Sequence, residues 1–288
     1  MSDNVTAINW YPGHMTKARR MMQEDIKLID VVIELLDARI PFSSRNPDID
    51  ELAGNKKRMI LLNKADLADE AITRAWTEYF TGMGYEVVTL DSRTQNKMKN
   101  VLASVMMTCK EKIERDRKRG IINRPVRAMV VGIPNVGKST FINSFAKKAV
   151  TKTGNKPGVT KGKQWIRLNK DVELLDTPGI LWPKFEDRQV GIKLALIGSI
   201  NDEILNIEEL TLDLIDRLRN DYPGIIKDRY NIEEDGANHE VLERIAIRRG
   251  AIKKGNEVDY EKAANIVIDE YRAGKLGRIT LEKPQNNI

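Results

Sequence analysis

The sequence predicts a doubly wound α/β domain with a six-stranded, mainly parallel sheet, followed by a small all-α domain. Two patterns predict this fold class. Short apolar runs typical of buried parallel strands alternate with longer amphipathic segments up to about residue 182. Beyond that point the strand signals stop and only helical periodicity continues. We therefore place the α/β domain at residues 1–185 and the helical domain at residues 186–288.

Each expected element has its own local signal. Strands are expected at short runs that are mainly apolar or β-branched, which are 31–36, 58–62, 85–90, 128–131, 164–168 and 172–175, the last two forming a hairpin-like pair. Helices are expected where apolar residues recur at helical spacing, at 15–28, 69–82, 96–118, 138–147, 187–200, 207–219, 239–249 and 259–273. Residues 149–163, rich in Gly, Thr and Lys, are expected to form a mobile loop.

Composition limits the classes of protein that fit. The chain has 288 residues, of which 41% are hydrophobic and 31% charged, as expected for a soluble protein with substantial cores. No apolar run approaches the roughly 18 residues of a membrane span, and the first ten residues do not resemble a signal peptide. The single cysteine, Cys109, excludes an internal disulfide and a cysteine-based zinc cluster. We expect a cytoplasmic monomer with no membrane partner.

Basic residues gather in three segments, although the net charge is only +6. Segment 147–167 has seven bases and no acid, and segment 244–254 has five bases and no acid. Segment 110–127 has eight bases and three acids. Each run taken alone is also compatible with a solvated face, but three of them together favour a nucleic acid partner.

A glycine-rich string lies between the predicted strand 128–131 and the helix that follows it. The string Gly132-Ile-Pro-Asn-Val-Gly-Lys-Ser139 has the spacing of a phosphate-binding P-loop. Its glycines let backbone N–H groups converge on phosphate oxygens, and the helix N-terminus adds its dipole. We expect Lys138 to lie between the β- and γ-phosphates and the Ser139 hydroxyl to ligate Mg²⁺. The other expected contacts of this loop with the nucleotide are made by Asn135, Val136, Gly137 and Thr140.

A second string, Asn63-Lys-Ala-Asp66, is expected to select guanine, and we call residues 63–66 the base-recognition loop. The Asp66 carboxylate can accept hydrogen bonds from guanine N1–H and the exocyclic amine together. Adenine would present an acceptor to the same carboxylate, and each unpaired buried group costs about 1–3 kcal/mol, which excludes ATP. We expect Lys64 and Ala65 to lie along the base and Asn63 to brace the P-loop. The residues that directly follow the third strand, Asp91 and Ser92, are placed for a contact with guanine O6.

The third string, Asp176-Thr-Pro-Gly179, ends the last predicted strand. Asp176 is expected to hold Mg²⁺ through water, and the Gly179 N–H to contact the γ-phosphate. Thr160 is our choice for a second Mg²⁺ ligand, with Thr153 as the competing candidate. Ile180 occupies the position where many GTPases have the Gln that orients the attacking water.

The order of these three strings is unusual because the base-recognition loop precedes the P-loop. This order resembles the circularly permuted GTPases, and the chain as a whole is similar to the bacterial family of them that assembles the large ribosomal subunit. The resemblance runs nearly end to end and includes Trp10-Tyr-Pro-Gly-His-Met15, Asp37-Ala-Arg-Ile-Pro41, Asp176-Thr-Pro-Gly-Ile-Leu-Trp-Pro183 and Gly274-Lys-Leu-Gly-Arg278. It implies GTP hydrolysis stimulated by the ribosome and a helical domain that contacts ribosomal RNA. Permuted families with zinc modules fit poorly, because they need cysteines that this chain lacks.

Since Ile180 can neither donate nor accept a hydrogen bond, another group is expected to orient the water. Permutation places the N-terminal segment near the point where the chain leaves Gly179, so His14 is the catalytic candidate. The family resemblance also implies a histidine in this motif, whereas His239 has no such context. Asn135 matches a feature of K⁺-activated GTPases, although an asparagine that braces the loop fits equally well.

The sequence thus predicts an Mg²⁺-dependent GTPase that binds GTP and GDP and acts in late maturation of the large (50S) ribosomal subunit. We expect nucleotide-dependent binding to rRNA in the precursor, mainly through segments 147–167 and 244–254, and release after hydrolysis. Two alternatives remain. One is an RNA-binding scaffold with GTP as a structural ligand and negligible turnover, and the other is a GTPase that acts on a non-ribosomal RNA.

Overall fold

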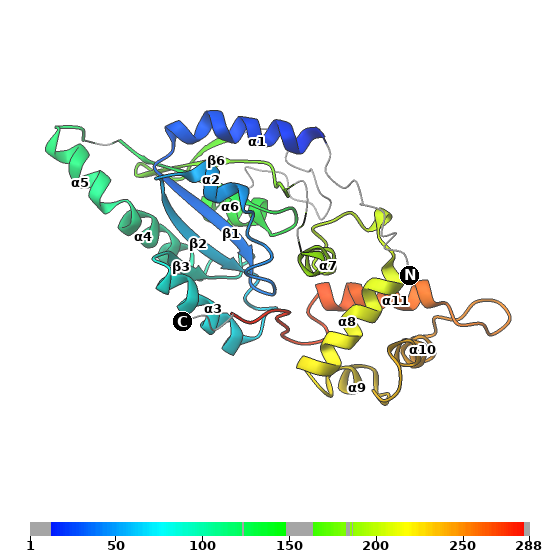
Figure 1. Cartoon of the computed structure of the whole chain (residues 1–288). Coiled ribbons are helices and arrows are strands. Elements are labelled where there is room, and N and C mark those ends of the chain that lie inside the picture. Colours follow the sequence, from blue (N-terminus) through cyan, green and yellow to red (C-terminus); the bar gives the residue numbers. More distant parts are fainter. Residues whose placement is uncertain (1–12, 123, 148–163, 183–184, 186, 285–288) are drawn as a thin grey trace.

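A six-stranded sheet with helices packed around it and a group of helices beside it make up the molecule (Figure 1). The computed structural model describes residues 13–122, 124–147, 164–182, 185 and 187–284. Within these residues the predicted fold class is confirmed. None of the helices described there has the length and apolarity that crossing a bilayer requires.

The sheet is parallel except at one edge. Its strands are β1 (Val31–Asp37), β2 (Lys57–Asn63), β3 (Glu86–Thr89), β4 (Val126–Gly132), β5 (Gln164–Arg167) and β6 (Val172–Asp176). They lie in the order β3-β2-β1-β4-β6-β5, and only β5 runs antiparallel to its neighbour. Strands β1 and β4, which lie side by side at the centre, join two halves of the sheet that are separate in the sequence. Because the other strands are parallel, their carboxyl ends meet at one edge, where open α/β sheets bind ligands.

The described helices follow the predicted segments closely. In the first part of the chain they are α1 (Gly13–Asp25), η1 (Ile26–Leu28), α2 (Asp48–Ala53), α3 (Glu70–Gly82), α4 (Met98–Thr108), α5 (Lys110–Lys118) and α6 (Lys138–Ala146). In the second part they are α7 (Arg188–Leu196), η2 (Asp202–Ile204), α8 (Ile207–Asp221), α9 (Ile225–Tyr230), α10 (Asn238–Arg249) and α11 (Tyr260–Arg272). The short helices α2 and α9 were not predicted, because six residues are too few to show helical periodicity.

The single helix predicted at 96–118 is two helices, α4 and α5, divided at Cys109. Cys109 has φ −96° and ψ 8°, outside the α-helical region. Helix α4 buries Met98, Val101 and Val105, whereas α5 buries no residue and projects from the body of the protein (Figure 1). The fully buried face therefore ends where the helix breaks, and beyond it Ile113 of α5 is only partly buried against the core. The loop predicted at 149–163 lies outside the described residues.

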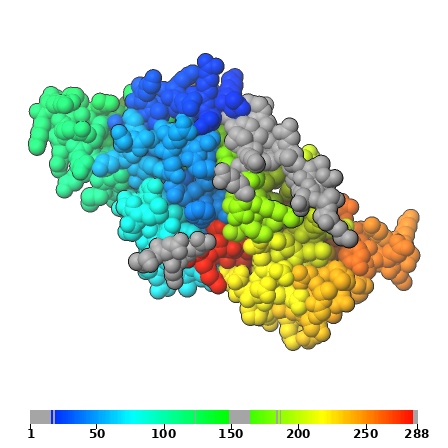
Figure 2. Space-filling model, in the orientation of Figure 1, coloured from blue at the N-terminus to red at the C-terminus, as the bar shows by residue number. Residues whose placement is uncertain are grey.

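One continuous core joins the sheet to the helices that follow it. Every residue of β1 is buried, as expected for a central parallel strand covered on both faces. The same core includes Leu174 of β6, Leu214 of α8 and Val267 of α11. After α11 the chain returns to the α/β part, and this last segment lies in the boundary between the two parts (red in Figure 2).

Candidate nucleotide-binding site

The P-loop connects the end of β4 to the start of α6 and has an unusual backbone. Asn135 and Gly137 have φ values of 58° and 94°, both in the left-handed region. A Cβ atom at Gly137 would also lie 2.5 Å from Asn63 Nδ2. Glycine is therefore required at this position for two reasons, the backbone conformation and the close approach of another loop.

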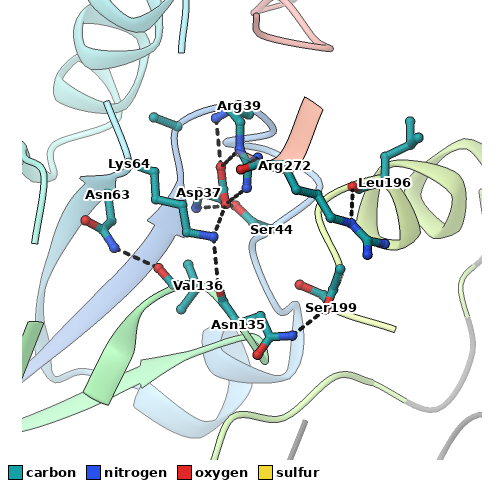
Figure 3. Close-up of polar contacts among 12 residues, drawn as sticks. Asp37, Arg39, Ser44, Asn63, Lys64, Asn135, Val136, Leu196, Ser199 and Arg272 are labelled. Carbon is teal, nitrogen blue, oxygen red and sulfur yellow. Dashed lines mark hydrogen bonds and ion pairs between the residues drawn. The ribbon is translucent and has the colours of Figure 1, made fainter. Parts of the chain in front are cut away.

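The base-recognition loop is bonded directly to the P-loop (Figure 3). Asn63 Nδ2 donates to the Val136 carbonyl at 2.7 Å, across 73 residues of sequence. Lys64 Nζ donates to the Asn135 carbonyl at 2.7 Å, and Asn63 Oδ1 accepts from the Ser92 N–H at 2.9 Å. The two loops that the nucleotide hypothesis requires to be neighbours are thus in contact, and Asn63 braces the P-loop as predicted.

The Asp66 carboxylate offers one oxygen for a ligand. Its Oδ1 atom is buried without a hydrogen-bond partner among the described residues, while Oδ2 pairs with Arg93. Arg93 also binds Asp91 through Nε at 2.9 Å, and its hydrogen bonds lower the pKa of that carboxylate. A buried acceptor without a partner is costly, so a donor such as guanine N1–H would stabilise this site. The adjacent Ala65 is held by a hydrogen bond from its N–H to the Leu90 carbonyl.

A shallow pocket of about 620 Å³ adjoins these loops. Its lining residues are Gln95, Asn143, Ser144 and Lys147. The Ser144 hydroxyl donates to the Ser92 carbonyl at 2.6 Å and the Ser144 carbonyl accepts from Gln95 Nε2 at 2.8 Å. The pocket therefore lies at the carboxyl end of α6, near Ser92, and its described lining includes none of the predicted nucleotide contacts.

Two opposite charges are buried at the phosphate end of the site. Lys138, at the start of α6, is 6% exposed, and burial lowers its pKa to about 8 although Asp176 opposes this shift. Asp176, at the end of β6, is 1% exposed, and burial raises its pKa. Neither Asp176 oxygen has a hydrogen-bond partner in the described part of the chain. Charges buried in this way are stabilised when anionic and cationic ligands neutralise them.

These residues fit Mg²⁺ held together with phosphate oxygens. Proteins bind this ion with one or two carboxylates, a hydroxyl and substrate phosphates, and Asp176 and Ser139 supply the protein share of that set. Across the described ranges there is no cluster of three or more His, Cys, Asp or Glu side chains suited to a metal ion.

The Asp176–Gly179 segment packs against the P-loop. The Thr177 hydroxyl donates to the Val130 carbonyl at 2.8 Å, and a Cβ atom at Gly179 would lie 3.1 Å from Pro134 Cα. The Ile180 N–H donates to the Gly132 carbonyl at 3.3 Å, and the Ile180 side chain is buried. A buried hydrocarbon side chain offers no hydrogen bond to a water molecule at this position.

The remaining predicted residues are placed less completely. His14 is the second residue of α1, and its side chain lies outside the described part of the structure. Thr160 and Thr153 fall outside the described residues. Thr140 is half-buried on α6, and the Asn135 amide nitrogen donates to the Gly198 carbonyl beyond α7 at 2.5 Å. This contact does not test the role of Asn135 in K⁺ binding, which stays a prediction.

Sequence reasoning missed a buried ion-pair cluster behind the base-recognition loop (Figure 3). Asp37, at the end of β1, accepts from Arg39 Nη2 at 2.8 Å and Nε at 2.9 Å, and pairs with Lys64 Nζ at 3.0 Å. Burial alone would raise the pKa of Asp37, but the two cations outweigh it and hold that pKa well below its usual value. The available signal was an acid at the end of a mainly apolar strand, followed two residues later by an arginine.

A circularly permuted P-loop GTPase is the class of protein that this fold and site define. The P-loop lies on a central strand, and the base-recognition loop, which contacts it, comes from the preceding half of the chain. Residues 127–237 match the family described as 50S ribosome-binding GTPase.

Over the full length, the chain is 48% identical to ribosome biogenesis GTPase A of Bacillus cereus, across 96% of this chain and 94% of the relative. Two solved structures of YlqF are also similar. A GDP-bound structure has TM-score 0.69 and 30% identity and covers 93% of this chain and 100% of its own. A GNP-bound structure from Thermotoga maritima has TM-score 0.65 and 31% identity and covers 93% and 99%. The chain therefore belongs to the ribosome biogenesis GTPase A family.

Proposed function

We propose that this protein is a GTP-hydrolysing assembly factor for the large ribosomal subunit. It binds rRNA in the late 50S precursor in its GTP state and is released after hydrolysis. The observation that carries the proposal is the direct bonding of the base-recognition loop to the P-loop through Asn63 and Lys64. The family supports the ribosomal target, since its relatives are named for ribosome biogenesis.

The proposed nucleotide contacts follow from the geometry of the site. Asp66 accepts from the guanine ring, the Lys64 stem lies along the base, and Ser92 with Asp91 lies near O6. Backbone N–H groups of the P-loop hold the phosphates, with Lys138 charged between them. Ser139 and Asp176 would hold Mg²⁺, with Thr160 as a further ligand. When bound, that ion offsets the charge that develops on the phosphates.

We propose that turnover is slow in the free protein and is stimulated by the ribosomal subunit. The buried Ile180 supports this, because no hydrogen-bonding group stands at the usual position for orienting water. His14 is the proposed catalytic residue that orients the water. His14→Ala should keep GTP affinity but lose most of the ribosome-stimulated phosphate release. Unchanged release would remove His14 from the mechanism.

Basic surfaces are the proposed contacts with rRNA phosphates, so binding should weaken steeply with salt. In segment 244–254 several cations already have intramolecular partners. Arg249 pairs with Glu270 at 2.8 Å, and Arg244 pairs with Asp235 at 3.0 Å. Segment 110–127, by contrast, includes exposed arginines on the projecting helix α5. We therefore add α5 to segments 147–167 and 244–254 as a proposed RNA contact.

The decisive experiment is sedimentation of the protein with immature and mature large subunits in the presence of GDP or a non-hydrolysable GTP analogue. Preferential co-sedimentation with the immature subunit in the GTP state is expected. Equal binding with both nucleotides would contradict nucleotide-dependent release.

An RNA-binding scaffold that uses GTP only structurally is the second candidate, and the buried Ile180 is the observation that favours it. Phosphate release in the presence of large subunits distinguishes the two, because the scaffold predicts no stimulation. Comparing the rates in KCl and NaCl also tests whether Asn135 contributes to a K⁺ site, since that role predicts faster release in KCl. For either candidate we propose a cytoplasmic monomer, with residues 186–288 as the RNA-binding domain.

A further inference from the structure

The end of the base-recognition loop is bonded to residues 279–282, which we call the C-terminal segment. The Ile279 N–H donates to the Leu67 carbonyl at 3.0 Å. The Asp69 N–H donates to the Thr280 hydroxyl at 3.1 Å. Leu67 directly follows Asp66, the proposed guanine contact, so the C-terminal segment bonds to the backbone next to the residue that selects the base.

The C-terminal segment is buried between the two parts of the molecule (red in Figure 2). Ile279, Thr280 and Leu281 are 1%, 2% and 7% exposed. The Leu281 N–H donates to the Arg39 carbonyl at 2.8 Å on the α/β side. The Thr280 N–H donates to the Tyr222 hydroxyl at 2.9 Å on the helical side. The segment therefore holds the helical part and the base-recognition loop in one arrangement.

A single carboxylate fixes the end of this segment. Glu282 accepts hydrogen bonds from the Ser43 N–H at 2.9 Å, the Ser43 hydroxyl at 2.6 Å and the Phe42 N–H. It also pairs with Lys193 of α7 at 2.9 Å, and its side chain is only 7% exposed. A buried carboxylate with this many donors has a well-defined position, because leaving any of them unpaired would be costly.

The other end of the base-recognition loop is supported from the same direction. Arg39 Nη1 donates to the Arg272 carbonyl at the end of α11, at 3.4 Å. The Arg39 guanidinium also lies 5.5 Å from the ring centre of Tyr271 and pairs with Asp37. Asp37 in turn holds Lys64 (Figure 3). Lys64 is thus held through Asp37 and Arg39, and the backbone after Asp66 is held directly, by contacts with the C-terminal segment.

We propose that the C-terminal segment is a positioning element for guanine recognition. When docked, it keeps Asp66 in the geometry that binds the base. A loop that adopts this geometry only part of the time binds its ligand more weakly by that fraction. The coupling is reciprocal, so bound guanine nucleotide keeps the C-terminal segment docked. This inference depends on the guanine nucleotide binding proposed above. It adds that the C-terminal segment controls the position of the base-recognition loop.

Thr280 provides an isosteric test. Thr280→Val keeps the volume but leaves the Asp69 N–H without its acceptor, whereas Thr280→Ser restores the hydroxyl. We expect Thr280→Val to raise the Kd for GDP about three- to tenfold and Thr280→Ser to stay within about twofold of the parent. The matched control is Arg278→Gln, because Arg278 adjoins the segment and, among the residues that the structure describes, pairs with the exposed Glu70. It should leave the Kd unchanged.

Base discrimination separates positioning from general destabilisation. Inosine diphosphate lacks the exocyclic amine that Asp66 is proposed to bind, so the ratio of its Kd to that of GDP reports the placement of this carboxylate. Thr280→Val should lower that ratio, whereas loss of global stability alone would weaken both nucleotides equally. Glu282→Gln is the second variant and should shift the ratio in the same direction.

Hydrogen exchange of the parent protein tests the reciprocal effect without any substitution. Amides of residues 276–282 should exchange more slowly with GDP bound than in the free protein. Unchanged exchange there, or an unchanged Kd and base ratio in folded Thr280→Val and Glu282→Gln, would overturn the proposal while the proposed function stands. Failure of the parent protein to bind GDP would instead overturn the proposed function.

Discussion

Replacing Asp37 with asparagine should destabilise the protein and weaken its binding of guanine nucleotides. Asp37 is 0% exposed, and its carboxylate neutralises Arg39, which is 1% exposed, together with Lys64. Asparagine has almost the same volume, so the substitution creates no cavity and removes only the negative charge. Two cations are then left without their counter-ion, one of them fully buried.

The magnitude follows from this burial. Removing one partner of a buried ion pair costs about 3–5 kcal/mol, because the remaining charge is uncompensated. The contribution of Lys64 is discounted, since its side chain is 23% exposed and is partly solvated. We expect the free energy of unfolding to fall by about 3 kcal/mol, and the Kd for GDP to rise because Lys64 is no longer held.

Urea unfolding of the nucleotide-free protein at pH 7 measures this loss. The pKa of Asp37 is lowered in the folded protein, so its stabilising charge is fully present above the usual carboxylate pKa and is lost only as the pH falls below it. The matched control is Glu111→Gln, which breaks an exposed pair with Lys57 and should leave the free energy of unfolding unchanged. A loss below about 1 kcal/mol for Asp37→Asn, with an unchanged Kd, would refute the reasoning.

Three further predictions follow from other features of the site. Gly137→Ala should weaken GDP binding at least about 100-fold in calorimetry, because it combines a left-handed backbone with a collision at Asn63 Nδ2. Gly84→Ala has a similar φ of +87° but nothing within 4 Å, so it should cost only strain and leave binding intact. Affinity for GDP should fall as the pH rises through about 8, by up to about tenfold per pH unit. The reason is that Lys138 in the nucleotide-free protein loses its proton there, whereas binding to phosphate requires the charged form. An affinity that stays constant from pH 7 to 9.5 would contradict this. On helix α5, Arg117→Ala should reduce by about one the slope of log affinity for large subunits against log salt, and an unchanged slope would show that this helix makes no phosphate contact.

Much of the candidate nucleotide site could be proposed from the sequence because its chemistry lies in short contiguous strings. The spacing from Gly132 to Ser139 specifies a loop whose N–H groups converge, whatever the rest of the chain does. The apolar run before Asn63 predicted a strand that delivers it to the ligand-binding edge of the sheet, and β2 ends at that residue. Local sequence was sufficient where a feature depends on one turn and its flanking elements.

Contacts between distant segments could not be predicted in this way. Nothing near Thr280 indicates that its hydroxyl accepts from the Asp69 N–H, 211 residues away. The break at Cys109 was also missed, because periodicity continues across it to the partly buried Ile113, although no residue of α5 is fully buried. Such features depend on which surfaces meet after folding.

By itself, then, the sequence determined the sheet, the class of the protein and the motifs of the candidate site, because periodicity and motif spacing are properties of neighbouring residues. Only the tertiary structure decided that Asp37 and Arg39 support Lys64, and that the end of the chain bonds beside Asp66. The physical reason is that a buried charge or N–H group must find a partner, and that partner is whatever the folded chain brings within hydrogen-bonding distance.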